Sequence, residues 1–198
     1  MLLAMGAAGC ARLLTYIPRW ACRTIASVFF TGLAFCGAYI CAVIVPLQSA
    51  GPLRDFALKN NGDLREEFGW TEMVRTVAAI RDSLPGDQQS SLGLIVGNYG
   101  EQGAIEMLGP AYSLPPPISM TNSAWLRGYP TPPPTTLIVL GFSKEHADRT
   151  FTNCRLAGHN GNPEGIKNEE SEDHPDIFVC GPPIEPWPVF WRNDQRFG

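Results

Sequence analysis

A glycine-rich turn is the first place where the sequence suggests chemistry. The turn, residues 97–103, reads Gly-Asn-Tyr-Gly-Glu-Gln-Gly and follows the apolar run 92–96. Backbone N–H groups at such a strand-to-helix junction favour a bound anion. The glycines are three residues apart, however, and the dinucleotide-binding fingerprint requires the spacing G-x-G-x-x-G. We therefore favour tight turn packing, with Glu101 at the positive end of the helix dipole.

An acidic run at residues 169–173 contains the carboxylates Glu169, Glu170, Glu172 and Asp173. Carboxylate oxygens are ligands for divalent cations, but the spacing here does not match an EF-hand loop. Acidic runs of this kind are more often solvated loops, so we predict no metal site. Glu101 and Glu169 would suit a general acid and base, although nothing in the sequence places them together.

Two cysteines, Cys154 and Cys180, lie far from the apolar N-terminal region that contains the other four. They would pair in an oxidising compartment if neighbouring strands brought them together. A metal site with His159 or His174 is the weaker alternative, because no close C-x-x-C or H-x-x-x-H pair is present. The sequence also has no G-x-S-x-G motif and no cysteine in a suggestive histidine context. We predict no catalytic residue and no cofactor.

Residues 24–46 form a predicted transmembrane helix. No charged residue occurs between Thr24 and Val45, and a helix of this length crosses the ~30 Å hydrocarbon core. Three arginines precede this segment and an acidic region follows it, which favours a single pass with the N-terminus in the cytoplasm. A cleaved signal peptide is the alternative, but its apolar region would be shorter, about 7–15 residues.

The first 23 residues are then a cytoplasmic or interfacial segment. Residues 1–14 are apolar and too short to span, and they resemble either the end of a preceding membrane helix or an interfacial helix. We expect the lipid bilayer of the cell inner membrane as one partner and a periplasmic or extracellular C-terminal domain. Nucleic acid is excluded as a partner, because only three of the 15 basic residues precede Pro46 and the remaining 12 are outnumbered by 19 acidic residues.

Residues 47–68 are a predicted connector, and residues 69–198 a predicted extracytoplasmic α/β domain. Apolar residues recur at helical spacing from Trp70 to Leu84, and two further helices are predicted at 101–108 and 144–151. Four predicted strands cover residues 92–97, 135–141, 152–158 and 176–180. Their alternation with helices predicts a small, mainly parallel sheet with flanking helices. The proline-rich stretches 114–117 and 130–134 are predicted connectors, and Trp187 and Trp191 are predicted core residues.

Several short sequence segments, taken in order, resemble the C-terminal soluble region of bacterial family 39 glycosyltransferases. These enzymes are relatives of the dolichyl-phosphate-mannose protein mannosyltransferases and of the aminoarabinose transferases. The resemblance covers nearly the whole chain after the predicted span, and its specificity lies in the order of the pieces. The pieces are 68–74, 97–105, Gly109-Pro110 with Tyr112 and 114–115, Asn122-Ser123 with Trp125, the strand that ends at Gly141, 157–158 with 162–163 and Gly165, 168–170 and 177–180.

The resemblance implies a multi-pass enzyme that transfers a sugar from a polyprenyl-phosphate donor to an acceptor outside the membrane. In that family the catalytic acidic residue lies in the first extracytoplasmic loop, and this sequence has no acidic residue before Asp55. We therefore expect a cap or accessory portion that works with a multi-pass catalytic partner and helps to place a polyprenyl-phosphate sugar or a glycan acceptor. A stand-alone, membrane-anchored glycan- or protein-binding module is the alternative. Polar or aromatic residues in predicted loops at strand ends are the expected substrate-binding set: Asn98, Tyr99, Glu101, Asn122, Trp125, Asn168 and Glu169.

Overall fold

The chain divides into two compact units, residues 1–64 and 65–198. The computed structural model describes residues 18–45 and 49–197. The apolar residues 1–14, for which we predicted a membrane or interfacial helix, lie outside the described residues. The second unit contains the whole predicted extracytoplasmic domain.

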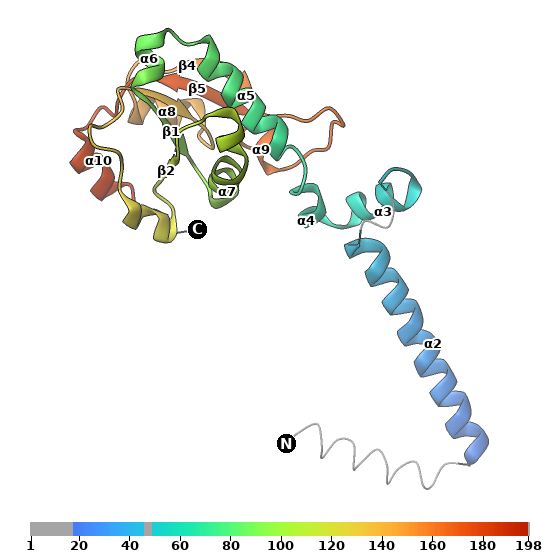
Figure 1. The fold of residues 1–198 in the computed structure, drawn as a ribbon. Coiled ribbons are helices and arrows are strands. Elements are labelled where there is room, and N and C mark those ends of the chain that lie inside the picture. The colour runs from blue at the N-terminus through green and yellow to red at the C-terminus, as the bar shows by residue number, and fades with distance from the viewer. Residues whose placement is uncertain (1–17, 46–48, 198) are drawn as a thin grey trace. The chain divides into compact units, whose positions relative to one another are not determined.

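The first unit is helical, and its main element is the long helix α2, Arg19–Ile44 (Figure 1). The shorter helices α3, Pro52–Asn60, and α4, Gly62–Arg65, follow. Helix α2 has 26 residues, its apolar side chains are exposed, and it is long and apolar enough to cross a membrane. A signal sequence near the N-terminus has the same properties. The structure therefore shows an apolar N-terminal helix that is either a membrane span or a signal sequence.

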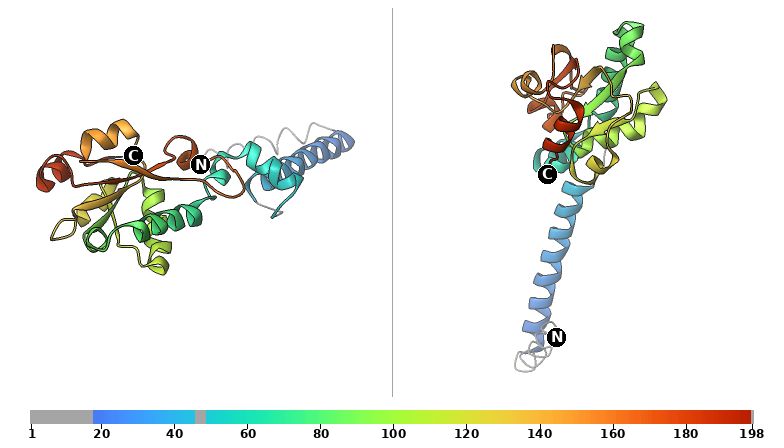
Figure 2. Two further views of the ribbon diagram at one scale, coloured as in Figure 1. Left: turned by 90° about the horizontal axis from the view of Figure 1, so that it is seen from above. Right: turned by 90° about the vertical axis from the view of Figure 1, so that its left-hand side faces the viewer.

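The second unit is a five-stranded sheet with helices on both faces (Figures 1 and 2). The strand order across the sheet is β2-β1-β3-β5-β4. The strands are β1, Leu92–Val96; β2, Pro117–Ser119; β3, Thr136–Val139; β4, Arg155–His159; and β5, Asp176–Cys180. The helices are α5, Trp70–Ser83; α6, Gly86–Ser90; α7, Tyr99–Leu108; α8, Lys144–Thr150; α9, Glu169–Glu172; and α10, Trp187–Asn193, with the 3-10 turns η1, Gly109–Tyr112, and η2, Asn122–Arg127.

The central strands are buried on both faces, which is why their sequences are continuous apolar runs. In β1, Leu94 and Val96 pack with helices α5 and α7, whereas Ile95 points to the opposite face. That opposite face is covered by α8 and α10, and Figure 2 shows the two helix layers on either side of the sheet. Trp187 and Trp191 are each only 8% exposed in this second core, as predicted.

The sheet is mixed, so the predicted mainly parallel sheet is confirmed only in part. Strands β2 and β3 run parallel to β1, but β5 lies between β3 and β4 and is antiparallel to both. The alternation of strands and helices predicted a mainly parallel sheet, with a loop rich in Gly, Asn and acidic residues between the strands at 152–158 and 176–180. The segment between β4 and β5 contains only the one-turn helix α9, so the chain returns beside β4, which an antiparallel pair permits without a crossover.

One strand was missed because it begins inside a proline-rich stretch. Residues 114–117 were predicted as a connector, but Pro117 is the first residue of β2. β2 is an edge strand that pairs only with β1, and proline is tolerated at the first position of such a strand because no N–H is needed there. The short β2 places its carboxyl end beside that of β1.

Cys154 and Cys180 are joined by a disulfide. Cys180 ends β5, and Cys154 immediately precedes the neighbouring strand β4, so the sheet brings the two residues together. Of the two alternatives left open by the sequence, the structure has the disulfide. Disulfides persist in oxidising compartments. Together with the apolar helix α2, the disulfide indicates membrane anchoring or secretion, with the second unit outside the cytoplasm.

Candidate functional site

An open pocket of about 350 Å³ lies where β1 and β3 end. After β1 the chain crosses to β2 on one side, and it then returns to β3 on the other side of β1. This reversal of direction is where ligands bind in open α/β sheets, outside the carboxyl ends of the strands. The lining residues come from four separate segments of the chain: Gly97, Asn98, Gly141, Phe142, Ser143, His146, Glu169, His174 and Arg196.

Glu101 is a fully buried carboxyl group beneath the floor of this pocket. It lies in the first turn of α7, and its Oε2 accepts a hydrogen bond from the backbone N–H of Gly97 at 2.8 Å. Its Oε1 has no hydrogen-bond partner among the described residues. Burial raises the pKa of Glu101 to about 7, and the nearby carboxylate of Glu170 acts in the same direction. The group therefore carries a proton over part of the physiological pH range.

The ends of β1 and β3 approach each other so closely that only glycine fits at both positions. A Cβ atom on Gly97 would lie 2.5 Å from the carbonyl oxygen of Gly141. A Cβ atom on Gly141 would lie 2.6 Å from Oε2 of Glu101, and Gly141 also has a positive φ of 72°. The glycine at position 97 thus serves strand packing, which is the interpretation that the sequence favoured over a phosphate-binding turn.

Asn98 links the backbone of Glu101 to the buried carboxyl group of Glu170. Its Oδ1 accepts from the backbone N–H of Glu101 at 2.8 Å and caps helix α7, while its Nδ2 donates to Oε1 of Glu170 at 3.0 Å. Glu170 is only 6% exposed, and burial raises its pKa as well. Glu101 and Glu170, which are far apart in the sequence, therefore belong to one buried polar cluster at the edge of the pocket.

Helix α9 carries Glu169 and Glu170, and its N-cap residue Asn168 ties it to the start of α5. Asn168 forms a reciprocal capping box with Ser171 and donates from Nδ2 to the carbonyl oxygen of Phe68 at 2.8 Å. The backbone N–H of Glu169 is bound by the carboxylate of Glu66 at 3.1 Å. Asn168 is thus buried and structural, whereas Glu169 lines the pocket.

Replacing Asn98 with alanine should lower the free energy of unfolding by roughly 2 kcal/mol. The change removes a helix cap, which costs about 1 kcal/mol, and leaves Oε1 of Glu170 without its donor in a buried setting, which costs about 1 kcal/mol or more. Urea unfolding of the full chain in detergent, followed by tryptophan fluorescence, measures the loss. Tyr99→Ala is the control, because the neighbouring Tyr99 side chain is exposed. Equal stabilities of the two variants would show that the Asn98 contacts contribute little.

Arg196, His146 and Phe142 contact one another in the lining of the pocket. The guanidinium carbon of Arg196 lies 4.9 Å from the centre of the Phe142 ring, and its Nη2 lies 2.9 Å from Nε2 of His146. Arginine can only donate, so His146 accepts through Nε2 and carries its proton on Nδ1. Burial lowers the pKa of His146, and the adjacent Arg196 lowers it further. The ring is therefore neutral at physiological pH.

The pocket brings together only part of the expected substrate-binding set. Asn98 and Glu169 line it, and Glu101 lies beneath its floor. The side chain of Tyr99 is 74% exposed and does not line the pocket, and Asn122 is half-buried in the turn after β2. Trp125 is partly buried and packs against the core: its ring stacks on Trp191 and its Nε1 donates to the Trp191 carbonyl oxygen.

Sequence reasoning missed four side chains that line the pocket, namely Phe142, Ser143, His146 and Arg196, and it considered His174 only as a possible metal ligand. The signal that was available is Gly141-Phe142-Ser143, a turn that directly follows a buried strand and supplies the N-cap of α8. No local pattern identifies Arg196, because it reaches the site from the last residues of the chain through pairing with the end of β2. Among the described residues, no group of three His, Cys, Asp or Glu side chains is placed to hold a metal ion.

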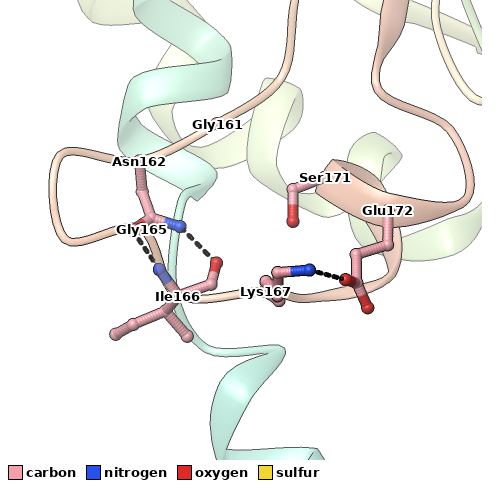
Figure 3. A pocket seen from close by; sticks show the side chains of 7 residues that line it. All are labelled: Gly161, Asn162, Gly165, Ile166, Lys167, Ser171 and Glu172. Carbon is pink, nitrogen blue, oxygen red and sulfur yellow. Dashed lines mark hydrogen bonds and ion pairs between the residues drawn. The ribbon is translucent and has the colours of Figure 1, made fainter.

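A second hollow of about 380 Å³ lies on the long loop between β4 and β5 (Figure 3). Its polar side chains bond to one another, since Lys167 pairs with Glu172 at 2.7 Å and both amide atoms of Asn162 bond to the backbone of Ile166. Figure 3 shows these pairs along the loop itself. The hollow is explained by the folding of the loop, and the pocket at the ends of β1 and β3 remains the candidate site.

Comparison of the chain with family models, with curated proteins and with solved structures finds no match of any kind.

Proposed function

We propose that this chain is a membrane-anchored accessory portion of a polyprenyl-phosphate-sugar-dependent glycosyltransferase, with helix α2 retained as a single-pass anchor and the N-terminus in the cytoplasm. The observation that carries the proposal is the polar pocket at the β1/β3 switch point of a unit that lies outside the cytoplasm. The reaction class is taken from the resemblance of the ordered sequence segments to family 39 glycosyltransferases. The role of the pocket is to hold part of the sugar or the acceptor while a multi-pass partner performs the transfer.

The composition of the pocket supports binding more than chemistry. Asn98, Ser143 and Glu169 offer hydrogen-bonding groups that suit hydroxyls, and Arg196 offers a fixed guanidinium. Glu101, whose pKa is raised to about 7, is fully buried, so a ligand in the pocket does not touch it. An accessory, substrate-placing role follows from this arrangement.

The test measures sugar transfer from a radiolabelled polyprenyl-phosphate sugar in membranes that express this chain, any multi-pass protein encoded by a neighbouring gene, or both. We expect transfer only, or at least tenfold faster, when both are present. Transfer by this chain alone would contradict the accessory role. Transfer by the neighbouring protein that is unchanged when this chain is added would contradict it equally.

A stand-alone, membrane-anchored binding module is the second candidate. The observation that favours it is the exposure of Tyr99, Met107 and Leu126, which are 74%, 82% and 76% exposed on the second unit. Exposed apolar side chains mark a binding surface where they form a contiguous patch. Absence of transfer in all three membrane preparations, together with pull-down of a glycan or membrane protein that is lost on Tyr99→Ser and Leu126→Ser substitution, would favour this candidate.

A further inference from the structure

The backbone of Arg196 is fixed beside the end of β2. Its N–H donates to the carbonyl oxygen of Met120 at 2.9 Å, and its own carbonyl oxygen accepts from the N–H of Asn122 at 2.8 Å. These two bonds continue the sheet pairing past β2 and hold the last residues of the chain against the body of the second unit. The Arg196 side chain therefore starts from a defined position.

The side chain is fixed as well. The guanidinium lies over the Phe142 ring, which is only 3% exposed, and bonds through Nη2 to the neutral His146 ring. Asp194 lies 3.5 Å from the same Nη2, a long and weak contact. Across the residues that the structure describes, Nε and Nη1 of Arg196 take part in no hydrogen bond. A positioned guanidinium with free donors in an open pocket has already lost the side-chain entropy that a ligand would otherwise have to remove.

We propose that Arg196 anchors an oxyanion in this pocket, the phosphate or carboxylate group of a sugar derivative, with Asn98 and Glu169 facing the hydroxyl groups. The planar guanidinium matches two oxygens of a carboxylate or a phosphate through parallel N–H donors. The inference rests on the proposed function in using the same pocket, and it deepens that function by naming the class of ligand.

We expect the pocket to select its ligand through the positions of its hydrogen-bonding groups and not through a strongly positive electrostatic potential. The pocket also contains the acidic side chain of Glu169, and Asp194 lies beside Arg196, so the surroundings are not strongly positive. A simple anion such as inorganic phosphate gains only the contact with Arg196. An anionic sugar also gains hydrogen bonds from its hydroxyls to Asn98 and Glu169, and it should bind more tightly than either phosphate or a neutral sugar.

Isothermal titration of the full chain in detergent tests the proposal, with glucose 6-phosphate, glucuronate, inorganic phosphate and glucose as probes. Glucose 6-phosphate carries a phosphate and glucuronate carries a carboxylate, so comparison of these two probes shows which oxyanion the pocket binds. Arg196→Gln should weaken binding of the better anionic sugar roughly ten- to hundredfold, the range expected for losing a hydrogen bond to a charged group. Arg196→Lys keeps the positive charge but loses the parallel N–H donors of the guanidinium, so it should bind the anionic sugar less tightly than the wild type does. Arg192→Gln, an exposed arginine on α10 outside the pocket, is the matched control and should bind as the wild type does.

Binding of an anionic sugar that Arg196→Gln leaves unchanged would overturn the proposal, and so would equal affinities for glucose and for the two anionic sugars. Lack of measurable binding by every probe at millimolar concentration would overturn it too. Tryptophan fluorescence shows whether each variant is folded, because Trp191 lies in the core, and Trp125 packs against it, on the same face of the sheet as Phe142. The titration requires no partner protein, so its failure is separate from failure of the transfer assay.

Discussion

Gly141→Ala is expected to destabilise the second unit by about 4 kcal/mol. Two costs add at this position. A positive φ of 72° costs about 1–2 kcal/mol for a residue with a Cβ atom. The new Cβ would also lie 2.6 Å from Oε2 of the buried Glu101, and overpacking of this kind costs about 1–3 kcal/mol. Urea unfolding of the full chain in detergent measures the change.

Two further variants separate these causes. Gly128→Ala tests backbone strain alone, because Gly128 has a φ of 74° and nothing within 4 Å of a Cβ atom. Gly141→Ala made in a Glu101→Ala background removes the carboxyl oxygens that the new Cβ would contact, but it leaves the Cα atom of Gly97 at 2.9 Å, so the loss should become smaller without disappearing. A loss that is the same in both backgrounds would show that contact with Glu101 is not what excludes a side chain at position 141.

The wild-type chain should lose about 3 kcal/mol of stability as the pH rises from below 4.5 to above 7. Glu101 has a pKa of about 7 in the folded chain and an ordinary value of 4.5 when unfolded. Between these values the folded state binds more protons than the unfolded state, so the free energy of unfolding decreases with increasing pH. Each pKa unit corresponds to about 1.4 kcal/mol, and the loss is complete above the folded-state value.

Glu101→Gln should remove most of this pH dependence, because glutamine does not titrate. Part of the dependence of the free energy of unfolding on pH will remain, since burial also raises the pKa of Glu170. Unfolding measured in urea at a series of pH values between 4 and 8 gives both curves. Glu145→Gln, at an exposed position of α8, is the control and should follow the wild-type curve. A Glu101→Gln curve parallel to the wild type would mean that Glu101 does not titrate in this range.

The same carboxyl group links stability to the pocket. Glu101 holds Gly97 through its N–H and lies against Gly141, and both glycines line the pocket. Protonation therefore changes the charge directly beneath the site where we propose an oxyanion to bind. We expect anion affinity to be lower at pH 8 than at pH 6, because the ionised Glu101 opposes a negative ligand. Titration of an anionic sugar at the two pH values, with Glu101→Gln as the pH-insensitive reference, measures this effect.

The sequence by itself determined the features that depend on local pattern. The uncharged run from residue 24 to 45 is enough to define an apolar helix, and the buried strands β1, β3 and β5 are visible as continuous apolar runs. The pairing of Cys154 with Cys180 could be suggested but not decided, because it depends on which strands are neighbours. The turn from Gly97 to Glu101 was identifiable as a strand-to-helix junction.

Only the tertiary structure decided the direction of β5 and the composition of the site. The apolar run of β5 is compatible with either orientation, and its insertion between β3 and β4 depends on the short return of the chain after β4. Arg196 reaches Phe142 and His146 through pairing of the last residues with the end of β2, a contact between segments far apart in the sequence. Glu101 has an unusual pKa because the sheet buries it next to Gly97 and Gly141, and burial is a property of packing that the identity of a residue does not contain.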